Sequence, residues 1–475
     1  MSTARKIAYN VGFSSLSKVA STLLALVSIG LITRYLGPEG FGEYTTTLAF
    51  FALFMALADF GLNTVSTREI SRKNADEVYI MGNVFTLRLI LSFALVLFVP
   101  LLIFFLPYTS SHKIAILLSL VAFFFSSSYT ILNGIFQKNL AMDRVALTEF
   151  VGKIIQVGMI YMMIQMDLGL VAIVGSLSIF MAFNFFVLLY LSRRYLSFSL
   201  RFDVSFWKQF LKQSFPLGIS VLITFFYFKF DVILLSFLQG QEAVGIYGAA
   251  YKIIENVVFF PAMIVGLVLP LLSHKIYDDK KSFRKVANAT AKTFFLLVIP
   301  MVIGGFMLSE DIILLIGGEA FLESVIVLQI LIFALAFMFF GNFFNALLVV
   351  ANKESFLMKI LFFCAIVNLI LNFVLIPTYS FVGAAITSVI TECMVVLLTG
   401  WAVRQKVGYQ FSVNSLGRIL VSGALMALFI YFLDSKLPFF VLLIVSMMVY
   451  FLGVIATRAI TKEEWQHFLP KHSSL

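Results

Sequence analysis

Several charged side chains of this sequence lie inside long apolar runs, where a charge is costly unless another group compensates it. Arg88, Lys153, Lys252 and Glu392 lie about 12 to 17 Å along their runs, at 1.5 Å per helical residue. On insertion scales, a charge at the centre of a membrane-spanning helix costs about 2.5 to 3.5 kcal/mol. The sequence therefore predicts that these residues form internal ion pairs or line a hydrated cavity.

Close neighbours along the chain could pair with these charges. The possible pairs are Glu149 with Lys153 at i,i+4, Lys252 with Glu255 at i,i+3, and Lys229 with Asp231 on one turn. Asp59, in the segment ALADFGLNTVSTREIS, could pair with Arg68 or Arg88, or could bind a cation. One interpretation of all these pairs is structural: the charges neutralise one another and fix helix packing.

An excess of cations over unpaired anions favours a second interpretation, in which the chain binds an anionic ligand. The candidate ligand-binding residues are Arg88, Lys153, Lys229 and Lys252. The residues expected to couple to an ion or to form ion pairs are Asp59, Glu149, Asp231, Glu255 and Glu392. The sequence leaves both interpretations open.

The elements that carry these residues are long and apolar. Hydrophobic residues make up 61% of the chain and charged residues 12%, against roughly 25% charged residues in soluble domains. About 20 helical residues cross a bilayer core, and about fourteen runs reach that length. The runs are 11–33, 41–62, 79–106, 113–136, 145–165, 169–191, 215–238, 244–272, 287–308, 325–350, 356–376, 381–403, 416–433 and 438–457. They exceed the ~10 residues of a barrel strand and lack period-2 alternation, so we expect an all-α polytopic membrane protein.

The distribution of basic residues predicts the orientation of these spans. Of the lysines and arginines in the connections or near the ends of the spans, all but Arg34, Lys113 and Lys436 fall on one side of the membrane if the spans alternate. Because basic loops stay cytoplasmic, we expect both termini on the cytoplasmic side of the inner membrane. The net charge of +10 is dispersed over many short loops, so the sequence does not favour nucleic-acid binding.

A short motif occurs twice and indicates an internal duplication. Residues of the segment RYLGPEGFGEY recur 203 positions later in SFLQGQEAVGIYGAAY, as Gly37 and Gly240, Glu39 and Glu242, Gly42 and Gly245, and Tyr44 and Tyr247. An even number of spans separates the copies, so the halves are related by an axis along the membrane normal. We expect an N-lobe of helices 1-6 (residues 1-200), a C-lobe of helices 7-12 (residues 201-410), and a final helix pair with the tail (residues 411-475).

Several classes of protein are disfavoured by what the sequence lacks. The longest connections, of about 15 to 20 residues, are too short for a folded catalytic domain. The sequence has no G-x-x-x-x-G-K-[ST] phosphate loop, and its histidines show no spacing typical of a metal site. Cys364 and Cys393 fall inside predicted spans and are expected to be free. We expect no enzyme activity, no cofactor and no metal.

Four segments resemble one family of exporters. They are RYLGPEGFGEY, DFGLNTVSTREIS, SFPLGISVLITFFYFKFDVILLSFLQGQEAVGIYGAAYK and PAMIVGLVLPLLS. The resemblance is to the polysaccharide-repeat (O-antigen type, Wzx-like) flippases of the multidrug/oligosaccharidyl-lipid/polysaccharide exporter superfamily. It implies two six-helix lobes around a central cleft, working by alternating access.

The resemblance also implies a cargo and partners. The cargo would be an undecaprenyl-pyrophosphate-linked oligosaccharide that is moved across the cytoplasmic membrane for O-antigen, capsule or exopolysaccharide synthesis. Membrane lipids and the polysaccharide polymerase and ligase machinery would be its partners. A diphosphate cargo agrees with the buried cations. Two alternatives stay open: a cation-coupled small-molecule (multidrug) exporter of the same superfamily, and a membrane glycosyltransferase or polymerase.

Overall fold

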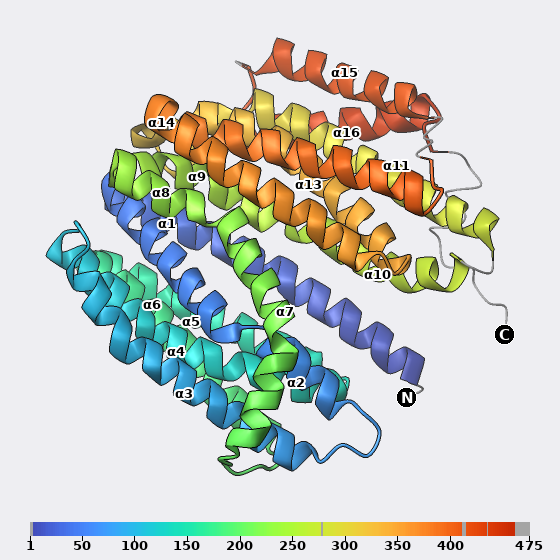
Figure 1. Cartoon of the computed structure of the whole chain (residues 1–475). Helices are drawn as coiled ribbons and strands as arrows, with labels where there is room; N and C mark the ends of the chain where they lie inside the picture. Colours follow the sequence, from blue (N-terminus) through green and yellow to red (C-terminus); the bar gives the residue numbers. More distant parts are fainter. Residues whose placement is uncertain (1–2, 277–278, 411–414, 435, 461–475) are drawn as a thin grey trace. The chain divides into compact units, whose positions relative to one another are not determined.

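The computed structural model describes residues 3–276, 279–410, 415–434 and 436–460. Helices make up nearly all of this part of the chain, and the described residues contain no strand (Figure 1). The expected all-α class is therefore confirmed. The end of the expected tail, from residue 461, lies outside the described residues.

The chain divides into two compact units, one formed by Met1–Ala249 with Leu369–Ala384 and the other by Ala250–Asn368 with Ala385–Leu475. The first unit contains α1 (Thr3–Asp59), α2 (Leu62–Ile70), α3 (Glu77–Phe104), α4 (Ser110–Lys138), α5 (Met142–Gln165), α6 (Gly169–Ser192), α7 (Val204–Phe228), α8 (Phe230–Gln239) and the start of α9 (Gln241–Val257). The second contains the rest of α9, α10 (Phe259–Lys275), α11 (Lys280–Met307), α12 (Ser309–Ile316), η1 (Glu319–Phe321), α13 (Ser324–Val350), α15 (Leu416–Leu433) and α16 (Phe439–Ala456). The long helix α14 (Glu354–Lys406) contributes to both.

The number of spans agrees with the sequence once two interrupted helices are taken into account. Twelve helical segments of the described residues are long and apolar enough to cross a membrane. Two of them contain a non-helical residue, Gly37 in α1 and Ser380 in α14. Figure 1 shows α1 turning back on itself. In α14, a Cβ on Gly383 would lie 2.3 Å from the carbonyl oxygen of Leu375, whereas residues eight apart in one helix are about 12 Å apart. Each of these helices thus supplies two spans.

The two copies of the repeated motif make the same turn. Gly37 has φ 66° and ψ −177°, and Gly240 has φ 88° and ψ −179°. This region of conformational space is accessible almost only to glycine, which explains why both copies have it there. The duplication read from the sequence therefore has a matching backbone conformation at both sites.

The two copies also pack against each other, at a contact that we call the repeat crossing (Pro38, Gly42, Gln241 and Gly245). A Cβ added to Gly42 would lie 1.7 Å from the carbonyl oxygen of Gln241, and one added to Gly245 would lie 1.8 Å from that of Pro38. Pro38 and Gln241 are themselves 203 positions apart, so the two contacts are reciprocal. The crossing has the local two-fold relation that a duplication produces, and only glycine permits so close an approach.

The final helix pair, α15 and α16, packs on α11 in the second unit. The Tyr450 hydroxyl of α16 donates a hydrogen bond to the Leu296 carbonyl of α11 at 3.0 Å, and Met426 of α15 belongs to the same buried apolar cluster. The division into lobes at residues 1-200, 201-410 and 411-475 stays a prediction.

Candidate functional site

The chain breaks its helical path between α1 and α2, and this break organises the most deeply buried charges. Phe60 and Gly61 take positive φ values of 41° and 77°. A Cβ on Gly61 would lie 2.8 Å from the Ser214 carbonyl oxygen and 2.6 Å from the Leu217 side chain, so α7 leaves room only for glycine. The break leaves carbonyl groups at the end of α1 without helical partners.

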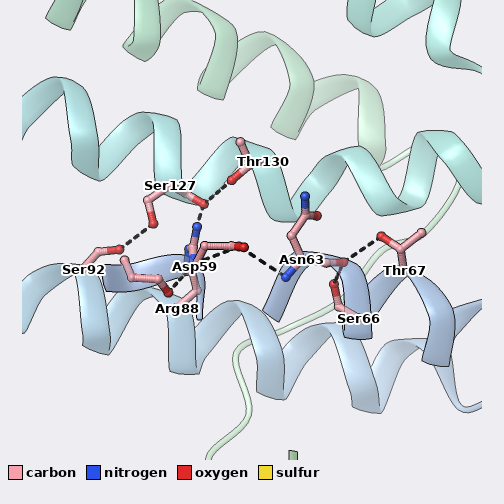
Figure 2. A network of polar contacts seen from close by, with 9 residues as sticks. Asp59, Asn63, Ser66, Thr67, Arg88, Ser92, Ser127 and Thr130 are labelled. Carbon is pink, nitrogen blue, oxygen red and sulfur yellow. Dashed lines mark hydrogen bonds and ion pairs between the residues drawn. The ribbon is translucent and has the colours of Figure 1, made fainter. Parts of the chain in front are cut away.

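Arg88 of α3 binds these orphan groups (Figure 2). Its side chain is fully buried. The guanidinium donates to the Ala58 carbonyl at the end of α1, and its Nε donates to the Ser127 carbonyl of α4 at 3.2 Å. It also forms an ion pair with Asp59, with 3.4 Å between Nη1 and Oδ1. Of the two partners considered for Asp59, the structure selects Arg88.

Asp59 and two serine hydroxyl groups extend this network, while Nη2 of Arg88 has no hydrogen-bond partner within the described residues. The Asp59 carboxylate accepts a hydrogen bond from the Asn63 backbone N–H at 3.4 Å, in the first turn of α2, where a negative charge is stabilised by the helix dipole. Ser92 and Ser127 share a hydrogen bond of 2.8 Å, as Figure 2 shows. Arg88 therefore closes a helix end and balances a carboxylate, an arrangement that is typical of a structural charge.

Lys153 and Glu149 lie on α5 with other partners than each other. The Lys153 ammonium donates to the Gln156 side chain at 3.0 Å and lies 5.8 Å from the centre of the Phe180 ring of α6. The Glu149 carboxylate interacts electrostatically with Lys18 of α1. Lys18 itself is exposed, and its position inside the run 11–33 is the sequence signal that could have linked it to Glu149.

Lys229 lies at the break between α7 and α8, and Asp231 lies in the first turn of α8. Asp231 is buried and accepts a 2.6 Å hydrogen bond from the Tyr247 hydroxyl of α9 and another from its neighbour Val232 N–H. Lys229 acts on the same carboxylate electrostatically. Tyr247 belongs to the repeated motif, and sequence reasoning did not connect it to Asp231, 16 residues earlier.

The second unit holds the remaining candidates. Lys252 and Glu255 form the predicted i,i+3 ion pair at 2.7 Å, with side-chain exposures of 15% and 36%. Glu392 is buried in the later half of α14, next to Thr391, which accepts a hydrogen bond from Asn368 at 3.2 Å. Among the described residues, no group of three or more His, Cys, Asp or Glu side chains could hold a metal ion. The structure thus distributes the candidates over separate local clusters, each with its own partners.

Comparisons with family models give two matches. The model of the family described as polysaccharide biosynthesis protein matches residues 7–275, more than half of the chain. The MatE model matches residues 216–374.

Among curated proteins, the chain is 27% identical to a "putative O-antigen transporter" of Shigella flexneri over 403 residues, 80% of this chain and 93% of the relative. It is 24% identical to the "capsular polysaccharide biosynthesis protein CapF" of Staphylococcus aureus, over 81% of this chain and 96% of the relative. Among solved structures, "lipid II flippase MurJ, inward closed conformation" superposes with a TM-score of 0.79 at 16% identity, covering 95% of this chain and 99% of MurJ. An inward-facing multidrug resistance MATE family transporter of the MOP superfamily gives a TM-score of 0.65 at 15% identity, covering 82% and 94%. The fold is that of MurJ and the MATE transporters.

Proposed function

Since the chain belongs to the polysaccharide biosynthesis protein family, we propose that it is a flippase that moves a lipid-linked oligosaccharide across the cytoplasmic membrane for surface polysaccharide synthesis. The observation that carries this proposal is the family match over residues 7–275 on a multi-pass membrane fold of the MurJ and MATE type. Relatives named as an O-antigen transporter and as a probable glycan flippase of Haloferax volcanii support it.

The cargo we propose is an oligosaccharide repeat unit linked to undecaprenyl pyrophosphate. Its diphosphate is an anion that must cross a low-dielectric layer, so positive charge along its path lowers the barrier. Lys153, Lys229 and Lys252 are the cations that we propose for this role. We remove Arg88 from the group because its guanidinium is fully buried and bound to Ala58, Asp59 and Ser127.

The transport cycle we propose is alternating access between two lobes, with both termini cytoplasmic. The polymerase and ligase that use the exported unit would act on the outer side. No chemistry on the cargo is required, because flipping changes the leaflet and breaks no bond.

The test is a deletion of the gene in its own host. We expect loss of the surface polysaccharide and accumulation of its lipid-linked repeat unit on the cytoplasmic side, and a plasmid copy should restore both. A copy carrying Gly158→Ala serves as a matched control, because nothing lies within 4 Å of a Cβ at that position. Unchanged surface polysaccharide in the deletion strain would exclude the proposal.

A second candidate, a cation-coupled small-molecule exporter, is favoured by the MatE match over residues 216–374. It predicts that the deletion strain becomes sensitive to lipophilic cations while its polysaccharide stays intact. The glycosyltransferase alternative has less support, because the described connections between helices contain no room for a catalytic domain.

A further inference from the structure

His112, near the start of α4, is a buried histidine whose ring has no hydrogen-bond partner. Its exposed fraction is 0%, and neither Nδ1 nor Nε2 is hydrogen-bonded within the described residues. A neutral imidazole carries one donor and one acceptor, and burying both unmatched costs free energy. Groups of this kind require an explanation, such as a proton or ligand that the site exchanges.

The residue closest to meeting that need is Glu43, whose backbone also interacts with the imidazole. Its Oε1 lies 4.0 Å from Nδ1 of His112, too far for a hydrogen bond but within the range of an ion pair if the imidazole gains a proton. Glu43 already accepts a 2.9 Å hydrogen bond from Thr109, which holds it beside the ring. The Tyr108 ring covers the imidazole, with 4.5 Å between ring centres.

Few other charges lie near the pair. α6, which packs on α4, carries no charged side chain. On α8 the single ionisable side chain, Asp231, is bound by Tyr247. Lys113 donates to the Phe104 carbonyl at the end of α3, and Glu39 is the remaining carboxylate within electrostatic reach of Glu43. A proton arriving here therefore has His112 and Glu43 as its nearest acceptors, with Glu39 as the neighbouring carboxylate.

The pair lies directly beside the repeat crossing. Glu43 follows Gly42, whose Cβ position faces the Gln241 carbonyl. Thr46, one turn further along α1, donates to the Gln241 side chain at 2.8 Å, and the Tyr108 hydroxyl shares a 2.7 Å hydrogen bond with Ser236 of α8. Movement of one repeat copy away from the other must therefore disturb the surroundings of His112.

We propose that His112 and Glu43 form a proton-binding site whose occupancy controls the repeat crossing, and that a proton bound there is the coupling ion of the transport cycle. This inference rests on the proposed function. In the close-packed crossing the His112 ring is fully buried, which favours a neutral imidazole. When the crossing separates, water enters, the imidazole takes a proton from hydronium and releases water, and the imidazolium pairs with Glu43. Protonation therefore favours the open crossing, by the linkage between proton binding and conformation.

The test follows the crossing directly and needs no cargo. Thr46→Cys and Gln241→Cys are introduced into the full-length protein lacking its native cysteines (Cys364→Ala, Cys393→Ala), and disulfide yield is measured in membranes between about pH 5.5 and 8, where histidine titrates. The same series is measured with His112→Phe, which keeps a ring against Tyr108, and the two yields are compared at each pH to remove the pH dependence of the thiols.

We expect the two proteins to give equal disulfide yields near pH 8. Near pH 5.5, we expect the protein that retains His112 to give a lower disulfide yield than the protein with His112→Phe. This deficit in disulfide yield should reach up to about tenfold if the proton affinity of the site differs tenfold between the close-packed and the separated crossing. Glu43→Gln should reduce this deficit, because the imidazolium loses its counter-ion, and it also tests the site if His112→Phe fails to fold. Lys113→Gln, one residue along but bound elsewhere, should preserve the deficit.

Yields that follow the same pH profile with His112 and with the His112→Phe substitution would overturn the proton site. Glycan export at several external pH values forms a separate arm. If export is absent while the crosslinking response is present, the proposed function fails and the proton site stands.

Discussion

At the residue scale, Arg88 binds the Ala58 carbonyl and the Asp59 carboxylate at the break between α1 and α2, and also the Ser127 carbonyl of α4. An arginine fork suits this task because it presents several donors in one plane, whereas a lysine offers a point charge. Removing one member of a buried ion pair is destabilising, because the other charge is left buried without a partner.

We therefore expect Arg88→Gln to destabilise the protein by about 3 to 5 kcal/mol and to lower its abundance in the membrane. Arg88→Lys should recover only part of the loss. The measurement is thermal unfolding monitored by size-exclusion chromatography, with Lys73→Gln, an exposed position, as the control. A normal melting temperature with lost export would instead return Arg88 to the group of cargo-binding residues.

Lys252 provides a contrasting case, in which export should be lost without loss of stability. Its partner Glu255 is partly exposed and lies only three residues away on the same helix. A partly exposed pair contributes at most about 1 kcal/mol to stability. Lys252→Gln should therefore reduce surface glycan severalfold at normal protein abundance, and Lys252→Arg should retain more export. A purely structural pair makes a different prediction: abundance falls with Lys252→Gln and returns when Glu255→Gln is added.

At the scale of elements, close approach and capping determine where helices begin, cross and end. The repeat crossing brings two helices within backbone contact, and the connection before α7 is fixed to α3. In that connection Asp203 caps α7 by accepting from the Phe206 N–H at 3.0 Å, accepts a hydrogen bond from the Tyr79 hydroxyl of α3, and its own N–H donates to Asn83 at 3.0 Å.

We expect the repeat crossing to be disrupted by the addition of a single methyl group to either of its glycines. Gly42→Ala and Gly245→Ala should each force the two backbones apart, by similar amounts, because the added Cβ would meet a carbonyl oxygen at 1.7 or 1.8 Å. We expect loss of export with either variant, measured as surface glycan per unit of membrane protein. Gly158→Ala, in open space on α5, should be neutral or stabilise its helix by up to about 1 kcal/mol. Full export by Gly42→Ala would show that the crossing does not need its close contact.

Asp203 predicts a dependence of stability on pH. The hydrogen bond from Tyr79, followed by that from Phe206, lowers the pKa of Asp203 below its ordinary value. A carboxylate whose pKa is lower in the folded state stabilises that state above the unfolded pKa, near 3.9, and the contribution disappears as pH falls through the folded pKa. The melting temperature of Asp203→Asn should therefore lie below that of the wild type at neutral pH, and the two should converge below about pH 4. A constant difference at all pH values would contradict this assignment.

At the scale of the whole molecule, the arrangement of spans determines which loops meet the cytoplasm. Fourteen spans with alternating basic loops require both termini on the same side. The interruptions at Gly37 and Ser380 are essential to this count, because reading α1 and α14 as single spans would invert the orientation of the elements between them.

The orientation is tested by single cysteines in the variant without native cysteines. Positions 201 and 279 should resist an impermeant thiol reagent in intact cells, whereas positions 319 and 379 should react. The physical reason is that lysine and arginine are concentrated around positions 201 and 279, and connections rich in these residues stay on the cytoplasmic side. Permeabilised cells provide the control for intrinsic reactivity. Strong labelling of position 279 from outside would reject the orientation and the span count together.

The sequence by itself determined the properties that depend on local composition. Apolar runs of about 20 residues determined an all-helical membrane protein, since a chain in lipid must satisfy its backbone groups within each span. The spacing of Lys252 and Glu255 determined an ion pair, because residues three apart share one helix face. The 203-residue repeat determined the matching turns at Gly37 and Gly240, because only glycine adopts that conformation.

Only the tertiary structure decided which distant groups meet. The sequence left Arg68 and Arg88 as possible partners of Asp59, and the packing of α3 against the end of α1 selected Arg88. Glu43 approaches His112 from 69 positions away, so no local spacing could identify that contact. The repeat was visible in the sequence, but its reciprocal packing depends on how α1 and α9 cross. Helix formation follows from each segment's own residues, whereas the partner of a buried charge depends on the packing of several helices, and that packing is a property of the whole fold.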